Sequence, residues 1–231
     1  MTRQLPLALC LPHSPALDEF VVGRNQVVVD ALHRALDTPG ETLVYLFGPA
    51  GCGRSHLLLG QCAAAERRGL RCAFLPLTER AALAPQMLEG LETLDLVAVD
   101  DVQAIAGDRE WEEALFALFN RCRDRATRMV FSADCGPAAL PLRLPDLRSR
   151  LAWGLSLSLQ PLDDAGRMQL LQSLAARRAL KLPEDVARYL LERTPRHPKD
   201  LVDTVARLDQ ASLAEKRRLT IPFVRDSLGL G

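Results

Sequence analysis

The sequence has no excess of charge of either sign. Its 29 lysines and arginines balance 29 aspartates and glutamates, so the formal net charge is zero. A protein that binds nucleic acid or an anionic membrane over a broad surface usually carries a net positive charge that attracts the phosphate groups. The charge balance argues against this class of protein, and any affinity for DNA would have to come from a local group of residues.

Closely spaced cysteines are also missing. The six cysteines form no C-x-x-C pair, and no paired histidines lie near them in the sequence. Zinc sites and disulfide frameworks are recognised by such spacings, and neither is indicated here. We predict reduced, mostly buried thiols, as in a cytoplasmic protein. The cysteines are Cys10, Cys52, Cys62, Cys72, Cys122 and Cys135.

Long hydrophobic runs are absent as well. The first residues, MTRQLPLALCLPHSP, place an arginine before an apolar run, but Pro6 and Pro12 interrupt it and no clear cleavage site follows. No later segment approaches the roughly 20 apolar residues that span a membrane. The sequence also has no internal repeat and no low-complexity tract. These absences predict a cytoplasmic protein without membrane contact.

The composition is that of an ordinary soluble protein. Its 231 residues, 48% of them hydrophobic, allow one α/β domain with a small companion. Short apolar runs alternate with helical patterns in the first two thirds of the chain, and this alternation predicts a parallel sheet flanked by helices. The predicted strands are residues 43–47, 71–75, 95–100, 128–133 and 154–159, and a clear helical pattern covers 110–124.

The pattern changes at Pro161, after which strand-like runs disappear and three or four helices are predicted. One of them begins at Pro198 and carries Leu201, Val205 and Leu208 on a single stripe, as in a helix that packs against others. A small helical bundle follows the sheet domain. We predict three parts, namely an N-terminal tail at 1–15, an α/β nucleotide-binding domain at 16–160 and a helical domain at 161–231.

The stretch GPAGCGRS, which begins at Gly48, has the spacing of a phosphate-binding loop except that Arg54 replaces the usual lysine. Gly48, Gly51 and Gly53 would let the backbone curl around a phosphate at the start of the next helix. Ser55 is placed to bind Mg²⁺. The alternative is a glycine-rich turn between a strand and a helix.

Acidic residues follow two predicted strands. In LVAVDDV, Asp100 and Asp101 come at the carboxyl end of a strand, where parallel sheets bind ligands. Asp100 would hold magnesium, and Asp101 would position or deprotonate an attacking water. Asp134 ends the strand MVFSAD and would lie near the γ-phosphate if the two strands are neighbours. The alternatives are solvated acids that cap the next loop and, for Asp134, a turn residue.

The stretch LPDLRSRL puts Arg148 and Arg150 on a short surface element before the last predicted strand. By themselves these arginines would be interpreted as ordinary surface charges.

Taken together, these stretches resemble AAA+ ATPases of the replication-initiator class, the relatives of DnaA, and most closely the Hda-type regulators. The resemblance spans nearly the whole chain and implies an AAA+ P-loop domain followed by a small helical lid domain. It depends on the stretches FVVGRN, GPAGCGRSHLL, LVAVDDV, FSAD, LPDLRSRLAWG and LTIPFV.

The resemblance explains Arg54, because Hda-type proteins carry arginine at this place. It also implies that the cofactor is ADP or ATP with Mg²⁺ and extends the nucleotide-binding loop to His56. A guanidinium is larger and more rigid than an ammonium group, so it can hold a diphosphate well and fit the transition state poorly. We therefore predict bound ADP and little or no ATP turnover by the protein itself.

Further roles are implied only by the resemblance. Arg150 matches the arginine finger, which points to the nucleotide of a neighbouring subunit, and Val21 and Val22 would help line the adenine pocket. Lys199, in HPKDL, stands where DnaA has a nucleotide-sensing arginine. Lysine keeps the charge but loses the planar fork, so Arg196 is an alternative sensor.

The N-terminal RQLPLAL resembles the short peptide by which bacterial proteins bind the sliding clamp, the beta subunit of DNA polymerase III. Gln4 would occupy a polar notch and Leu5 and Leu7 an apolar pocket. Pro6 shifts the proline relative to the usual pattern. The alternative is a tail without a partner.

The leading prediction is an Hda-type regulator of replication initiation. Bound to ADP and to the clamp on DNA, it would stimulate hydrolysis of DnaA-bound ATP and so prevent re-initiation. It would contact DNA only through the clamp, and whether it forms a homodimer is left open. The alternatives are an AAA+ ATPase with its own turnover, such as a helicase loader or DNA-remodelling protein, and a P-loop kinase.

Overall fold

A computed structural model describes residues 16–37, 43–195, 197–215 and 217–229. Within these residues the chain divides into two compact units. The first comprises residues 16–20 and 25–161, and the second comprises residues 21–24 and the described part of the chain from 162 onward. The short segment 21–24, which the sequence analysis assigned to the sheet domain, associates with the second unit.

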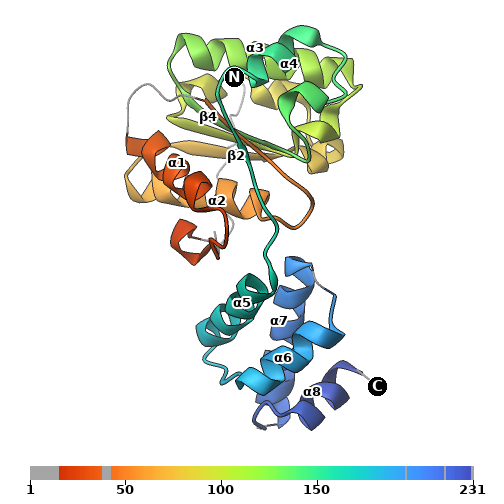
Figure 1. Ribbon diagram of the computed structural model, residues 1–231. Coiled ribbons are helices and arrows are strands. Elements are labelled where there is room, and N and C mark those ends of the chain that lie inside the picture. The colour runs from red at the N-terminus through yellow and green to blue at the C-terminus, as the bar shows by residue number, and fades with distance from the viewer. Residues whose placement is uncertain (1–15, 38–42, 196, 216, 230–231) are drawn as a thin grey trace, which may run out of the picture. The chain divides into compact units, whose positions relative to one another are not determined.

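A five-stranded parallel sheet forms the centre of the first unit, with the order β2-β3-β4-β1-β5 (Figure 1). Both neighbours of β1 run parallel to it, with Phe47 opposite Ala133 of β4 and Ser158 of β5. The carboxyl ends of all strands therefore meet at one edge of the sheet, and β3 and β4 are neighbours there. The strands are β1 (Leu43–Phe47), β2 (Cys72–Pro76), β3 (Leu96–Asp100), β4 (Arg128–Ala133) and β5 (Leu155–Ser158).

Helices cover both faces of the sheet. Helices α1 (Gln26–Asp37) and α2 (Arg54–Arg67) lie on one face, and α3 (Arg109–Asp124) and α4 (Pro145–Leu151) lie on the other (Figure 1). The predicted α/β fold, a parallel sheet flanked by helices, is thereby confirmed. Short 3-10 segments were not predicted; they are η1 (Leu17–Glu19), η2 (Leu77–Ala82), η3 (Pro85–Leu88), η4 (Leu91–Thr93), η5 (Val102–Ile105) and η6 (Pro137–Ala139).

The sheet is buried on both sides, so its strands read as nearly continuous apolar runs. Every residue of β3 is buried. Because side chains alternate between the faces of a strand, one face of the sheet packs against α3 and α4. The core on this face contains Tyr45, Val97, Val99, Met129 and Phe131 of the sheet and Trp111, Leu115 and Phe119 of α3.

The second unit is helical in the part that the structure describes. Asp163 accepts a hydrogen bond from the Gly166 N–H at 2.9 Å and so caps the first helix of this unit. The predicted stripe of Leu201, Val205 and Leu208 is buried in its core. The helices are α5 (Asp164–Arg177), α6 (Glu184–Arg193), α7 (Pro198–Glu215) and α8 (Ile221–Leu228).

The cysteines and the apolar character of the helices concern two predictions made from the sequence. None of the five cysteines in the part of the chain that the structure describes forms a disulfide, and three of them are buried. Within the same part of the chain, no helix combines the length and the apolar character that crossing a membrane requires.

Candidate functional site

The phosphate-loop sequence forms the turn between β1 and α2. Gly51 and Gly53 have φ angles of 78° and 99°, which an L-residue adopts only with strain. A Cβ on Gly53 would also lie 2.6 Å from Phe20 Cε2. Gly53 is the N-cap of α2 and has no side chain to bind the first N–H groups of that helix. These N–H groups and the helix dipole can therefore act on an anion.

Arg54, the first residue of α2, bends back over this loop. One terminal nitrogen of its guanidinium donates to the Gly48 carbonyl oxygen, and the other donates to Asp101 Oδ1 at 2.8 Å. The Arg54 and Asp101 side chains are only 11% and 17% exposed. The unusual arginine of the loop is thus paired with the second acid of LVAVDDV, which lies 47 residues further along the chain.

Asp100 ends β3 and is buried. Its carboxylate accepts a hydrogen bond from the Ser132 hydroxyl, and the Ser55 hydroxyl is near enough to help lower its pKa. Burial raises the pKa of Asp100, and the two hydroxyls oppose this shift by stabilising the charged form. The structure therefore places the predicted magnesium residues, Ser55 and Asp100, near each other.

The donor set fits a magnesium ion that is shared with a nucleotide. Mg²⁺ favours oxygen ligands and is commonly held by one or two carboxylates together with substrate phosphates. Ser55 and Asp100 supply two such oxygens. Among the described residues, no cluster of three or more histidine, cysteine or acidic side chains could hold a metal without further ligands.

Asp101 follows Asp100 in a left-handed conformation, with φ 57° and ψ 55°. Its N–H donates to Ser132 Oγ at 3.0 Å, and its Oδ1 accepts a second hydrogen bond from Gln103 Nε2 at 2.8 Å. The Gln103 side chain also accepts from the Asp134 N–H at 3.2 Å. The acid pair and Asp134 are thereby connected across the ends of β3 and β4.

Ser132 and Gln103 were missed by the sequence analysis. Ser132 is a polar residue within an otherwise apolar strand, and such an exception is a usable signal for a site. Pairing of Val99 with Phe131 places Asp100 beside Ser132. Gln103 carries no comparable signal, because its role depends on the course of the backbone after β3.

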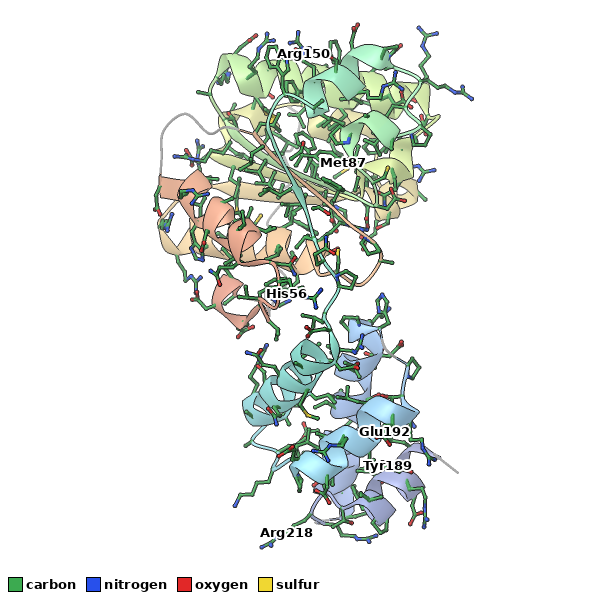
Figure 2. All side chains as sticks on the ribbon, viewed as in Figure 1. His56, Met87, Arg150, Tyr189, Glu192 and Arg218 are labelled. Atoms are coloured by element: carbon green, nitrogen blue, oxygen red, sulfur yellow. The ribbon has the colours of Figure 1, made fainter. Side chains whose placement is uncertain are left out.

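Arg150 lies on α4, away from the phosphate loop of its own chain. Figure 2 shows Arg150 at the opposite end of the first unit from His56, which belongs to the first turn of α2. The Arg150 guanidinium carbon lies 4.5 Å from the ring centroid of Trp153, and that of Arg123 lies 5.9 Å from it. Trp153 is 63% exposed. The sequence analysis did not single out this exposed aromatic support for Arg150.

The segment that leads into α4 is held by a buried carboxylate. Glu112 of α3 is 1% exposed. Its two oxygens accept from the N–H groups of Gly107, Arg143 and Leu144 at 2.8, 3.1 and 2.7 Å. Glu112 therefore fixes the chain immediately before the helix that carries Arg150.

Of the other predicted site residues, His56 belongs to the first unit, and the rest belong to the second unit or lie outside the described residues. His56 packs against Phe20, with ring centroids 5.7 Å apart. Val21, Val22 and Lys199 belong to the second unit, and Lys199 is exposed near the start of α7. Their nucleotide contacts stay predictions. Arg196, Gln4, Leu5 and Leu7 lie outside the described residues.

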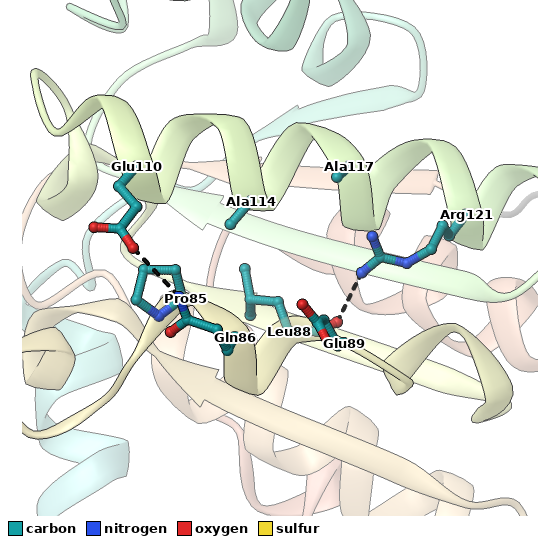
Figure 3. Close-up of a pocket in the computed structure, with 8 residues that line it drawn as sticks. All are labelled: Pro85, Gln86, Leu88, Glu89, Glu110, Ala114, Ala117 and Arg121. Carbon is teal, nitrogen blue, oxygen red and sulfur yellow. Dashed lines mark hydrogen bonds between the residues drawn. The ribbon is translucent and has the colours of Figure 1, made fainter.

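A surface hollow on the first unit is separate from this site (Figure 3). Gln86 Nε2 donates to Glu110 Oε1 at 3.4 Å at one end, and Arg121 donates to the Leu88 carbonyl oxygen at 3.0 Å at the other. None of the predicted site residues lines it. The lining residues are Pro85, Gln86, Leu88, Glu89, Glu110, Ala114, Ala117 and Arg121.

Two protein-family models match the chain. The model of the bacterial DnaA ATPase domain matches residues 11–158, and the model of the Hda lid domain matches residues 164–228.

Solved structures share the fold at low identity. Domain III of the replication initiation protein DnaA from Thermotoga maritima matches with a TM-score of 0.78 and 22% identity, over 93% of this chain and 95% of that one. AMPPCP-bound DnaA from Aquifex aeolicus matches with a TM-score of 0.74 and 22% identity, over 90% of this chain and 68% of that one. The Thermotoga maritima RuvB Holliday junction branch migration motor matches with a TM-score of 0.68 and 18% identity, over 89% of this chain and 68% of that one.

Proposed function

Because the chain belongs to the family of the bacterial DnaA ATPase domain and also carries an Hda lid domain, we propose that it is an Hda-type regulator of replication initiation. In this proposal the protein binds ADP, docks on the DNA-loaded sliding clamp and supplies Arg150 to ATP bound on DnaA. Hydrolysis of that ATP then leaves DnaA unable to initiate again.

The observation that carries this proposal is the position of Arg150. The residue lies at the far end of the first unit from the first turn of α2, which follows its own phosphate loop (Figure 2). A cation there can stabilise the charge that develops on a phosphate only if the phosphate belongs to another subunit. Stacking on Trp153 holds the guanidinium at an exposed surface, where such a subunit can reach it.

The phosphate loop supports a nucleotide in the protein itself. When ADP with Mg²⁺ is bound, it would supply the charge that the loop N–H groups, Arg54, Ser55 and Asp100 are placed to neutralise. The chain's own residues orient the phosphates in this arrangement. Slow turnover follows from the shape of the Arg54 side chain, because a planar guanidinium in place of the usual lysine fits the transition state poorly.

We expect the purified protein to retain ADP and to hydrolyse ATP slowly when alone. Arg54→Ala should release most of the bound nucleotide, because it removes the only side-chain cation of the loop sequence. The measurement is denaturation of the purified protein and chromatographic identification of the released nucleotide. Retained ATP, or steady-state hydrolysis comparable to that of an AAA+ motor, would count against the regulator.

The second candidate function is an AAA+ ATPase with its own turnover, such as a helicase loader or DNA-remodelling protein. It is favoured by one observation, the intact pair of acids at the end of β3, where Asp100 accepts a hydrogen bond from Ser132. The nucleotide measurement above separates the two functions.

For clamp binding, we expect the double substitution Gln4→Ala and Leu5→Ala to abolish capture of the protein by immobilised clamp. A short docking peptide contributes contacts to the clamp and little to the protein's own core. ADP retention and the thermal midpoint should therefore equal those of the parent protein. Surface plasmon resonance on the clamp checks this, and undiminished capture would show that another segment docks.

A further inference from the structure

Arg54 already has protein partners at the place where a nucleotide phosphate would bind. Its guanidinium donates to the Gly48 carbonyl oxygen and to Asp101 Oδ1. Both members of the ion pair are largely shielded from solvent, so water and salt screen it little. The Arg54 Nε is buried without an acceptor, which shows that these contacts do not satisfy the whole guanidinium.

The two members of the pair are not equally fixed. Asp101 is anchored by Gln103, which donates to the same oxygen, and by Ser132, which accepts from the Asp101 N–H. Arg54 is a long side chain on the first turn of α2, and its contacts all involve the guanidinium end. When a phosphate enters the loop, Arg54 is the member that can change partner.

We infer that Asp101 is an affinity-determining residue of the nucleotide site, because it competes with the phosphates of a nucleoside diphosphate for the Arg54 guanidinium. The inference rests on the proposed nucleotide-binding function. A ligand that needs the free guanidinium has its affinity reduced by the fraction of protein in which Arg54 is free. Asp101 therefore weakens the binding of the ligand that Arg54 helps to hold.

Removing the charge of Asp101 should tighten nucleotide binding through Arg54. We expect Asp101→Asn to bind ADP about tenfold more tightly than the parent, since one charge-assisted hydrogen bond no longer has to be broken. Isothermal titration calorimetry in EDTA measures this without a contribution from magnesium. Asparagine tolerates the left-handed backbone of this position, and Asp101→Gly gives the same expectation with a second variant.

A double-mutant cycle isolates the competition from a general loss of negative charge. In the Arg54→Ala background, Asp101→Asn should change ADP affinity by less than about twofold, because the group competed for is gone. Glu79→Gln is the matched control, since it removes an exposed carboxylate of η2 that has no place in the candidate site. Its expected effect is also below about twofold, as for an exposed charge screened by water.

The inference is overturned if parent and Asp101→Asn bind ADP equally, if the same tightening persists in the Arg54→Ala background, or if neither protein binds ADP. Failure of the proposed function gives a different result. A protein with the Arg54-dependent tightening but without any effect on DnaA keeps this inference and loses the regulatory role. A protein that accelerates hydrolysis on DnaA but shows no tightening keeps the regulatory role and loses this inference.

Discussion

Replacement of Arg150 by alanine is expected to abolish the acceleration of ATP hydrolysis on DnaA while the variant stays folded, retains ADP and binds the clamp. An arginine that stabilises the transferring phosphate of a neighbouring subunit is typically worth about 10³–10⁵ in rate. Arg150 is a half-buried surface residue whose contact is the exposed ring of Trp153. Its removal therefore costs the core little, and the loss falls on catalysis in the complex.

The measurement is the rate of hydrolysis of DnaA-bound ATP in the presence of clamp and DNA. Arg148→Ala is the matched control, because Arg148 lies on the same helix, α4, but outside the position that resembles the finger. Its effect should be small. An Arg150→Ala protein as active as the parent would exclude donation of this side chain to DnaA.

Replacement of Glu112 by alanine is expected to lower the free energy of unfolding of the first unit by about 3–6 kcal/mol. The substitution leaves three part-buried N–H groups without their acceptor. A fully buried unsatisfied donor costs about 1–3 kcal/mol, and partial exposure keeps each of these at about 1–2 kcal/mol. The donors belong to Gly107, Arg143 and Leu144. A loss of this size is a large part of the total stability of a typical domain, about 5–15 kcal/mol.

Urea unfolding followed by circular dichroism measures this loss, and the next residue provides the control. Glu113 pairs with Arg109 at 2.7 Å on the surface of α3, where the two side chains are 55% and 84% exposed. Glu113→Ala should change stability by less than about 0.5 kcal/mol. The stability of Glu112→Gln should lie between those of Glu112→Ala and the parent, because glutamine keeps one acceptor oxygen. Equal stability of Glu112→Ala and the parent would show that other groups satisfy these donors.

The strands were predictable because residues next to each apolar run mark where the strand ends. β1 and β4 have the predicted limits, since Gly48 follows one apolar run and Asp134 with Gly136 follows the other. The segment from 77 to 93 was not predictable, because its 3-10 turns have no sustained period of apolar residues. The order of strands is likewise not a local property, as β1 pairs with segments far along the chain.

The residues of the candidate site likewise include some that the sequence predicts and some that it does not. The loop glycines, Ser55 and Asp100 could be found because each stands at the end of a strand or the start of a helix. The bond between Arg54 and Asp101 could not be found, because it joins residues 47 positions apart and depends on the left-handed turn at Asp101. Glu112 was not singled out, because it is one of several acids in the helical pattern at 110–124, and its partners at Arg143 and Leu144 lie 31 and 32 residues further along the chain.

The strand order also determines when this protein can fold as it leaves the ribosome. β1 ends at Phe47, but its two neighbours begin only at Arg128 and Leu155. Both edges of β1 are unpaired while the intervening chain is being made, and an unpaired apolar edge is a template for association with other chains. Pairing across such long intervals is also slow. The strand that presents the phosphate loop is therefore open to association with other chains until Leu155–Ser158 has been made.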